Sequence, residues 1–313
     1  MCFLPQWRVS ETGTAFFNMS RKNSGYLLVF SAGILWGTIG LFVKQMELGG
    51  SSPVETAFLR VFFAFLILLV ICICRGGWRS LRADRRTVFI CALLGIVCHG
   101  IYNIFYSFAV TMAGVSISAV LLNIAPIFTL LCSCIFFQER FTSRKFIAIV
   151  INIIGCILTV TNGHLVISAL PFAGIIYGLG AGFCYAMTAI IGRFGTTHAD
   201  PFVLSMYSYL AASVPLFIWM RPWKNNYYFS IDICFWGFLF ALIPTAIAYI
   251  LYYQGLQKVK EPGKVPVIAS IETVVAALIG IFGYHERLGI VSLLGILLVL
   301  ISIAIMNHAN RIP

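Results

Sequence analysis

The chain has 313 residues, of which 60% are hydrophobic and only 10% are charged, and its mean hydropathy is +0.97. A soluble domain carries about 25% charged residues, so this composition excludes a soluble globular protein and indicates a membrane protein with many spans. The net charge of +11 could suggest nucleic acid as a partner, but the distribution of the basic residues along the chain argues against it.

Taken in chain order, ten apolar runs are long enough to cross a bilayer as helices, since about 20 residues at roughly 1.5 Å each span its core. The predicted spans are 25–46, 53–74, 87–109, 114–137, 146–162, 171–192, 202–220, 233–254, 264–284 and 289–307. The connections are short and leave little room for a soluble domain. We therefore predict an all-α membrane protein of ten transmembrane helices, with tails at 1–24 and 308–313.

The basic residues cluster in alternate connections between these runs. With the N-terminus in the cytoplasm, sixteen of the 21 Lys and Arg residues fall in the tails and the inner connections. Four fall in the outer connections, and Arg60 lies within a span. This is the distribution of the positive-inside rule. We predict a multi-pass protein of the cell (plasma) membrane, with both termini in the cytoplasm and the lipid bilayer as its surroundings.

The ten cysteines do not indicate a disulfide framework or a metal site. Nine of them lie in or at the edge of apolar runs, where a thiol acts as a small hydrophobic group. The two residues of a Cys-x-Cys pair point about 200° apart on a helix and cannot share a metal through one face. We predict no metal site and no cofactor.

The two halves of the chain repeat each other. Glu139-Arg140 closes the fourth run and Glu286-Arg287 closes the ninth, 286 − 139 = 147 residues later. Further matches at offsets of 146 to 149 pair the first span with the sixth, the second with the seventh and the third with the eighth. Because five is an odd number of helices, the second copy enters the membrane from the opposite side. We predict two inverted five-helix repeats, 25–162 and 171–307, an architecture common among alternating-access transporters.

These features resemble a known family, the drug/metabolite transporter superfamily of the EamA type, over about 25–307. The resemblance is carried by Trp36-Gly37 in the first helix, Arg60 in the second, Pro126 in the fourth, and Glu139 and Glu286 at the ends of the fourth and ninth. It implies a secondary carrier, often an exporter of amino acids and other small metabolites.

The chain departs from this family in the ninth helix. Many members carry Glu-Pro there, whereas this sequence reads Glu272-Thr273. The carboxylate is kept, but the proline that breaks the helix is not. We therefore expect the helix break to be lost.

Polar residues follow one face of the third helix and of the eighth. His99, Asn103 and Tyr106 stand at i, i+4 and i+7, with Tyr102 beside them. Thr245, Tyr249 and Tyr252 repeat this spacing. We interpret both stripes as walls of a cavity. The alternatives are an aromatic belt at the interface and, for His99, a bond to a neighbouring helix.

Two charged residues lie deep within spans, where burial is costly. Arg60 either holds an anionic group of a substrate, such as a carboxylate, or pairs with Glu55 or Glu272, or extends outward. Glu272 is the only acidic residue deep in a span, and it is a candidate for taking up a coupling proton. The fourth helix adds Asn123, and Pro126, which can kink the helix and expose carbonyls to a cavity.

Small residues form ladders at four-residue spacing in the first and sixth helices. Gly33 and Gly37 form the first ladder, and Gly174, Gly178, Gly182 and Ala186 form the second. Such spacing lets two helix backbones approach closely, so we interpret both as packing seams.

The function that agrees best with these patterns is transport of small metabolites, with amino acids or related organic solutes as substrates and export as the direction. The chain lacks the G-x-x-x-x-G-K-[ST] loop of an ATP-driven pump and the H-E-x-x-H pair of a zinc protease, and we predict no enzymatic activity. A membrane-embedded lipid-handling or regulatory protein without solute flux stays as the alternative. The predicted substrate-binding residues are Trp36, Arg60, His99, Tyr102, Asn103, Tyr106, Asn123, Tyr185, Thr245, Tyr249, Tyr252 and Glu272.

Overall fold

The computed structural model describes residues 11–163, 171–224, 230–284 and 289–308, and every regular element within these ranges is helical. Ten helical segments there are long and apolar enough to cross a membrane. They are Ser24–Leu48, Pro53–Arg79, Arg85–Ala113, Ile117–Phe137, Ser143–Thr161, Phe172–Thr196, Pro201–Met220, Ile231–Lys258, Pro262–Tyr284 and Ile290–Asn307. Each overlaps one predicted span, so the prediction of an all-α protein with ten spans is confirmed. We number them spans 1 to 10.

Five spans are single helices and five are assembled from shorter segments. The single ones are α3 (Pro53–Gly76, followed by η1, Gly77–Leu81), α8 (Ser143–Thr161), α9 (Phe172–Thr196), α10 (Pro201–Met220) and α15 (Ile290–His308). Two of the assembled spans have two segments: span 1 consists of α1 (Glu11–Trp36) and α2 (Ile39–Leu48), and span 4 of α6 (Val115–Leu122) and α7 (Ala125–Phe137). Spans 3 and 8 have three segments each: α4 (Arg85–Leu93), η2 (Leu94–Ile101) and α5 (Tyr102–Ala113) form span 3, and α11 (Ile231–Ala241), η3 (Leu242–Ile247) and α12 (Ala248–Lys258) form span 8. Span 9 consists of η4 (Pro262–Lys264), α13 (Val265–Ala269) and α14 (Ile271–Tyr284).

Short polar residues fix where several spans begin. Ser52 forms a capping box with Glu55 before α3, in which each side chain bonds the other residue's backbone N–H. Asp84, Thr142 and Ser230 accept one backbone N–H each at the starts of α4, α8 and α11. These caps satisfy donors that the first helical turn leaves unpaired. The polar connections therefore end the apolar runs at defined residues.

Spans 4 and 9 are interrupted at positions related by the repeat. Span 4 breaks at Asn123–Ile124, before Pro126, as the sequence predicts, and the Asn123 side chain donates to the carbonyl of Ala119 at 2.8 Å. Span 9 breaks at Ser270, which is 270 − 123 = 147 residues later, and its hydroxyl donates to the carbonyl of Val267 at 2.6 Å. The expectation that span 9 had lost its break was wrong. A serine that bonds the backbone, itself held by a neighbouring helix, replaces the missing proline.

Spans 3 and 8 share a different irregularity. Leu94–Ile101 and Leu242–Ile247 are π-helical segments in the middle of otherwise α-helical spans. In span 8 the segment contains Pro244, which has no backbone N–H to continue the α-helical pattern. Each π-helical segment shifts the angular position of the residues that follow it. Residues before and after such a segment therefore do not share the face that regular α-helical spacing predicts for them.

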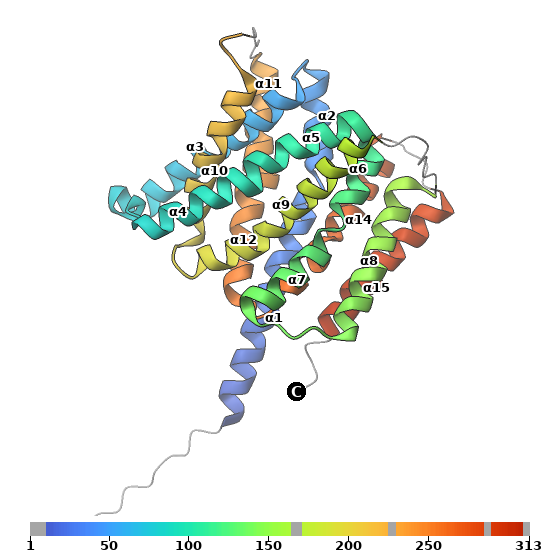
Figure 1. Ribbon diagram of the computed structural model, residues 1–313. Helices are drawn as coiled ribbons and strands as arrows, with labels where there is room; N and C mark the ends of the chain where they lie inside the picture. The colour runs from blue at the N-terminus through green and yellow to red at the C-terminus, as the bar shows by residue number, and fades with distance from the viewer. Residues whose placement is uncertain (1–10, 164–170, 225–229, 285–288, 309–313) are drawn as a thin grey trace, which may run out of the picture.

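The main helix pairs join one repeat to the other. Extensive contacts connect α8 with α15, α3 with α10, α1 with α12 and α5 with α9. The first two contacts join the fifth spans of the two repeats and the second spans of the two repeats. The other two join the first span of one repeat to the third span of the other, once in each direction. Exchanging the two repeats leaves this set of pairs unchanged, as an internal two-fold relationship requires. Figure 1 shows the α8–α15 pair at one edge of the bundle.

The glycine ladders pack as the sequence predicts. A Cβ at Gly33 would lie 2.5 Å from the carbonyl oxygen of Ala269, and one at Gly37 would lie 2.8 Å from that of Glu272. In α9, a Cβ at Gly182 would lie 3.0 Å from the carbonyl oxygen of Leu121. Small residues thus bring α1 against span 9 and α9 against span 4. Both contacts lie beside the two helix breaks.

Candidate functional site

A cavity of about 450 Å³ lies in the middle of the bundle. Eight of the ten spans contribute to its wall, and spans 7 and 10 do not. The breaks of spans 1, 4 and 9 all lie at this wall, since Gly37, Asn123 and Ser270 line it. Interrupted helices free backbone groups, and such groups are tolerated within a membrane where they line a cavity.

Arg60 is held against the wall of the cavity by span 8. Its Nε donates to the hydroxyl oxygen of Thr245 at 2.9 Å, and its guanidinium carbon lies 4.8 Å from the centre of the Phe240 ring. Thr245 in turn donates to the carbonyl of Phe240. Within the described residues no ion pair joins Arg60 to a carboxylate, so the suggested pairing with Glu55 or Glu272 was wrong. A cation is thus presented to the cavity on a fixed support.

Glu272 supplies an anion to the same cavity. It lies in the first turn of α14, directly after the break at Ser270, and its carboxyl group interacts with the Tyr185 hydroxyl of α9. It takes no part in the ion pairs found within the described ranges. The cavity therefore holds one positive and one negative group from different repeats.

Aromatic side chains form a large part of the remaining wall. Trp36 lies 4.9 Å from both Tyr249 and Tyr252 by ring centres, and Tyr102 stacks on Tyr106 at 6.0 Å. The Trp36 indole N–H is buried and has no hydrogen-bond partner among the described residues. Tilted and stacked rings at these separations form a rigid apolar surface. A ligand in this cavity meets flat aromatic faces as well as two charges.

The structure brings eight of the twelve predicted site residues to this cavity. They are Trp36, Arg60, Tyr102, Tyr106, Asn123, Tyr185, Tyr249 and Glu272. The other four lie behind the wall: His99 packs against Tyr209 and Tyr249, Asn103 bonds the carbonyl of His99, Thr245 supports Arg60, and Tyr252 packs against Trp36. The π-helical segments explain the displacement of His99 and Thr245, which lie within them, because the stripes assumed uninterrupted α-helices in spans 3 and 8. Asn103 and Tyr252 follow these segments, in α5 and α12, so the segments do not account for them.

Sequence reasoning missed Asn152 in span 5. Asn152 lines the cavity, and its amide donates to the hydroxyl oxygens of Ser270 at 2.6 Å and Ser302 at 3.0 Å. The signal was present, since an asparagine in the middle of an apolar run is costly unless it is bonded. Ser270 and Thr273, which also line the cavity, gave a weaker signal because hydroxyls commonly bond their own helix.

Comparison with known proteins agrees with this architecture. The model of the EamA-like transporter family matches residues 23–161 and 172–308, one match for each repeat. An uncharacterized transporter of Archaeoglobus fulgidus is 27% identical over 286 residues, which cover 89% of this chain and 94% of that protein. The uncharacterized transporter YwfM of Bacillus subtilis is 25% identical over 288 residues, which cover 91% and 94%.

The fold is also found among solved crystal structures, one of which aligns closely with this chain. Its TM-score is 0.79 at 14% sequence identity, and the alignment covers 91% of this chain and 99% of the other. The match therefore extends over both repeats rather than over one. The resemblance read from the sequence is confirmed, together with the prediction of a membrane transporter that is not an enzyme. The chain belongs to the EamA-like transporter family.

Proposed function

We propose that this protein is a secondary carrier of amino acids or closely related organic solutes, and that the central cavity is its substrate site. The observation that carries the proposal is the presence of Arg60 and Glu272 on one cavity, with no ion pair between them. An amino acid has a carboxylate and an ammonium group on one carbon. The carboxylate fits the guanidinium of Arg60, and the ammonium group fits the carboxylate of Glu272.

The aromatic wall favours solutes with an apolar or aromatic side chain. Trp36 and Tyr185 are in edge-to-face contact at 6.4 Å, and Tyr102 and Tyr106 continue the same surface. Rings arranged in this way bind planar apolar groups over a large area at a low cost in side-chain entropy. We propose that Arg60 and Glu272 bind the carboxylate and ammonium groups of the solute, and that the rings bind its side chain.

We further propose that the two repeats alternate between openings on opposite faces of the plasma membrane, with the termini in the cytoplasm. Two inverted repeats around a midplane site support alternating access. The basic residues of the tails and inner connections support the orientation. Export is proposed as the direction because the family resemblance implies it.

A coupling proton is proposed at Glu272. A carboxylate that faces the cavity without a basic partner can bind either a proton or the ammonium group of a solute, so the two compete. With Glu272→Gln, flux should no longer respond to a pH gradient. A pH gradient that still drives flux in this variant would exclude the residue as the proton carrier.

The central test is saturable flux by purified protein in proteoliposomes, with labelled aromatic amino acids. Arg60→Gln removes the charge, and because a hydrogen bond to a charged group contributes roughly 1.5–3 kcal/mol, KM should rise about tenfold or more. The parent should discriminate against the amide of the same amino acid, and Arg60→Gln should lose this discrimination. Arg79→Gln, at an exposed arginine, is the matched control and should behave as the parent does.

Two results would contradict the proposal. One is the absence of saturable flux for any amino acid in a panel of apolar, aromatic and polar side chains. The other is a parent that transports the amide as well as the acid, because the carboxylate would then have no role. The lipid-handling alternative predicts the first result, but no feature of the cavity favours it.

A further inference from the structure

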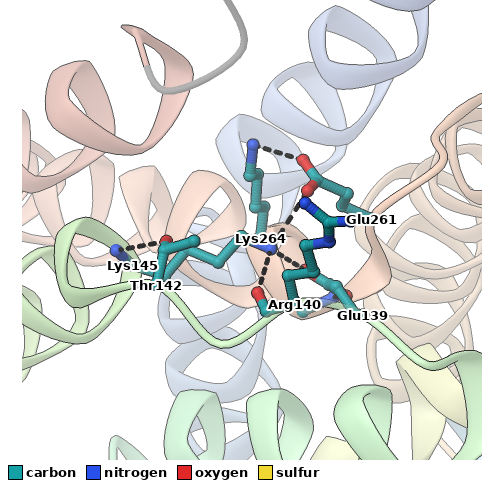
Figure 2. Close-up of polar contacts among 7 residues, drawn as sticks. Glu139, Arg140, Thr142, Lys145, Glu261 and Lys264 are labelled. Carbon is teal, nitrogen blue, oxygen red and sulfur yellow. Dashed lines mark hydrogen bonds and ion pairs between the residues drawn. The ribbon is translucent and has the colours of Figure 1, made fainter. Parts of the chain in front are cut away.

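Four charged side chains meet in a cluster at the side of the bundle where α1 begins and α15 ends, which we term the N-terminal side (Figure 1). This inner ion cluster consists of Glu139, Lys145, Glu261 and Lys264, drawn in Figure 2. Glu139 follows α7, and Lys145 lies in the first turn of α8. Glu261 precedes η4, and Lys264 ends it. The cluster therefore joins the connection between spans 4 and 5 to the connection between spans 8 and 9.

The contacts of the cluster cross from one repeat to the other. Lys145 Nζ lies 2.6 Å from Glu139 Oε1 and 3.0 Å from Glu261 Oε1, so it bridges the two carboxylates. The other oxygen of Glu261 pairs with Lys264. The backbone N–H of Gly263 donates to Glu139 Oε2 at 3.0 Å. Lys145–Glu261 and Gly263–Glu139 are thus two separate links between the repeats.

The members of the cluster are closely packed and mostly buried. Lys145 is 2% exposed, Lys264 1% and Glu139 9%. A Cβ at Gly263 would lie 2.9 Å from Glu139 Oε2, so the carboxylate occupies the space that a side chain would need. Buried charges are stable only when each has a partner, and removing one member leaves the others uncompensated.

One carboxylate of the cluster, that of Glu261, is suited to ion pairing at neutral pH. Burial alone would raise the pKa of Glu261, but the hydrogen bonds and charges of Lys264 and Lys145 outweigh it and lower this pKa below its ordinary value. Glu261 therefore carries its charge throughout the physiological range. The ion pairs of Glu261 therefore do not depend on its protonation in this range.

The cluster lies between the cavity and the N-terminal side. Lys264 is two residues before Pro266, which lines the cavity, and Glu139 follows the helix that begins beside the lining residue Pro126. The cavity continues in the other direction, to Gly40, Tyr106 and Ala277, which lie closer to the far ends of their spans. The contacts between the two connections therefore close the bundle beneath the cavity.

We propose that the inner ion cluster is a latch that stabilises the state closed on the N-terminal side, and that it separates whenever the cavity opens there. The proposal rests on the alternating access of the proposed function, but not on the identity of the solute. The two cross-repeat links exist only while the connections touch, so they stabilise one state and not the other. A contact present in only one of two states shifts the populations by its full contribution.

The test measures access, without any substrate, to the buried segment that lies between the cluster and the cavity. Ala269, which is 1% exposed and lies between Lys264 and Ser270, is replaced with Ala269→Cys in a background freed of native cysteines. A membrane-impermeant maleimide is then applied from each side, in intact cells and in inside-out vesicles. With Glu139→Gln we expect the labelling rate from the N-terminal side to rise roughly tenfold, within the usual range of conformational coupling. The rate from the opposite side should not rise.

Two companion variants make the result specific. Gly263→Ala places a methyl group against Glu139 without changing any charge, and it should accelerate labelling from the same side. Glu47→Gln makes the same chemical change as Glu139→Gln at an exposed residue of span 1 and should label at the parent rate.

The latch is excluded if Glu139→Gln and Gly263→Ala both elute as monodisperse folded protein and label at the parent rate. It is also excluded if labelling rises equally from both sides, because that indicates unfolding rather than opening to one side. If labelling rises as expected but no solute is carried, the latch stands and the proposed function fails. The two proposals can therefore be separated.

Discussion

Arg60 shows how a single charge is made usable within a membrane. Its Nε is satisfied by Thr245, and its guanidinium lies over the Phe240 ring, so one edge of the group is fixed by span 8. Thr245 lies in the π-helical segment that contains Pro244. The local irregularity of span 8 therefore positions a cation that belongs to span 2.

Thr245 should consequently act as a positioning residue for solute binding. Thr245→Val keeps the shape of the side chain but removes the acceptor for Arg60, and because such a bond contributes about 1 kcal/mol, KM for an amino acid should rise roughly fivefold. Thr245→Ser retains the hydroxyl and should restore the parent value. A structural role alone would not change the preference for the acid over its amide, and Thr245→Val should weaken this preference. An unchanged preference in flux measurements would contradict the assignment.

The sequence predicted individual site residues well where burying a charged side chain in an apolar run carries a large energetic cost. Arg60 and Glu272 stood out because a charge in an apolar run needs a compensating partner or water, and both line the cavity. His99 and Asn103 were placed on the same face as Tyr106 by assuming 3.6 residues per turn throughout span 3. The π-helical segment at Leu94–Ile101 changes that spacing for His99, but not for Asn103, which shares α5 with Tyr106. Span 3 has no proline that would predict the segment, as Pro244 does in span 8.

At the scale of elements, the break in span 9 has a cause outside span 9. Asn152 of α8 donates to Ser270 at the break and also to Ser302 of α15. All three side chains are buried, and those of Asn152 and Ser302 are fully so. A sequence search for proline or glycine could not find this break, because the residues that stabilise it lie 118 and 150 positions apart along the chain.

Asn152→Leu should therefore destabilise the protein more than Ser302→Ala does. The leucine leaves two buried hydroxyls without their donor, at a cost of about 1–3 kcal/mol for each unsatisfied group. Ser302→Ala removes only one bond and leaves Asn152 bonded to Ser270. Thermal unfolding in detergent, followed by tryptophan fluorescence, should give a lower Tm for Asn152→Leu. Equal Tm values for the two variants would show that the break does not depend on Asn152.

At the scale of the whole molecule, the lipid bilayer and the internal repeat of the chain together determine the fold. The ten spans followed from apolar length alone, and the five-plus-five division followed from matches near one offset. The pairing of helices across the repeats was not predictable, because every apolar face is compatible with lipid as well as with another helix. Only the small-residue ladders, such as Gly33 and Gly37, indicated where two backbones meet.

The inversion of the repeats makes a prediction about sidedness. Arg82 follows η1 after span 2, and Lys224 lies in the connection after span 7, so the two occupy corresponding places in the two repeats, and both are exposed. Arg82→Cys and Lys224→Cys should react with an impermeant thiol reagent from opposite sides of the membrane, with Arg82→Cys on the side of the N-terminus. Reaction of both from one side would mean that the repeats are parallel.

The pairing of helices across the repeats also has a consequence for how the protein is made. Each of α1, α3, α5 and α8 has its main partner in the second half of the chain, and Lys145 reaches Glu261 only after more than a hundred further residues have been joined. A nascent chain that has inserted five spans is thus still without most of its final contacts. The ribosome supplies the partners one after another: α9 and α10 end at Thr196 and Met220, whereas α12 and α15 end only at Lys258 and His308. The first half of the chain is therefore completed stepwise by the second half as it is synthesised.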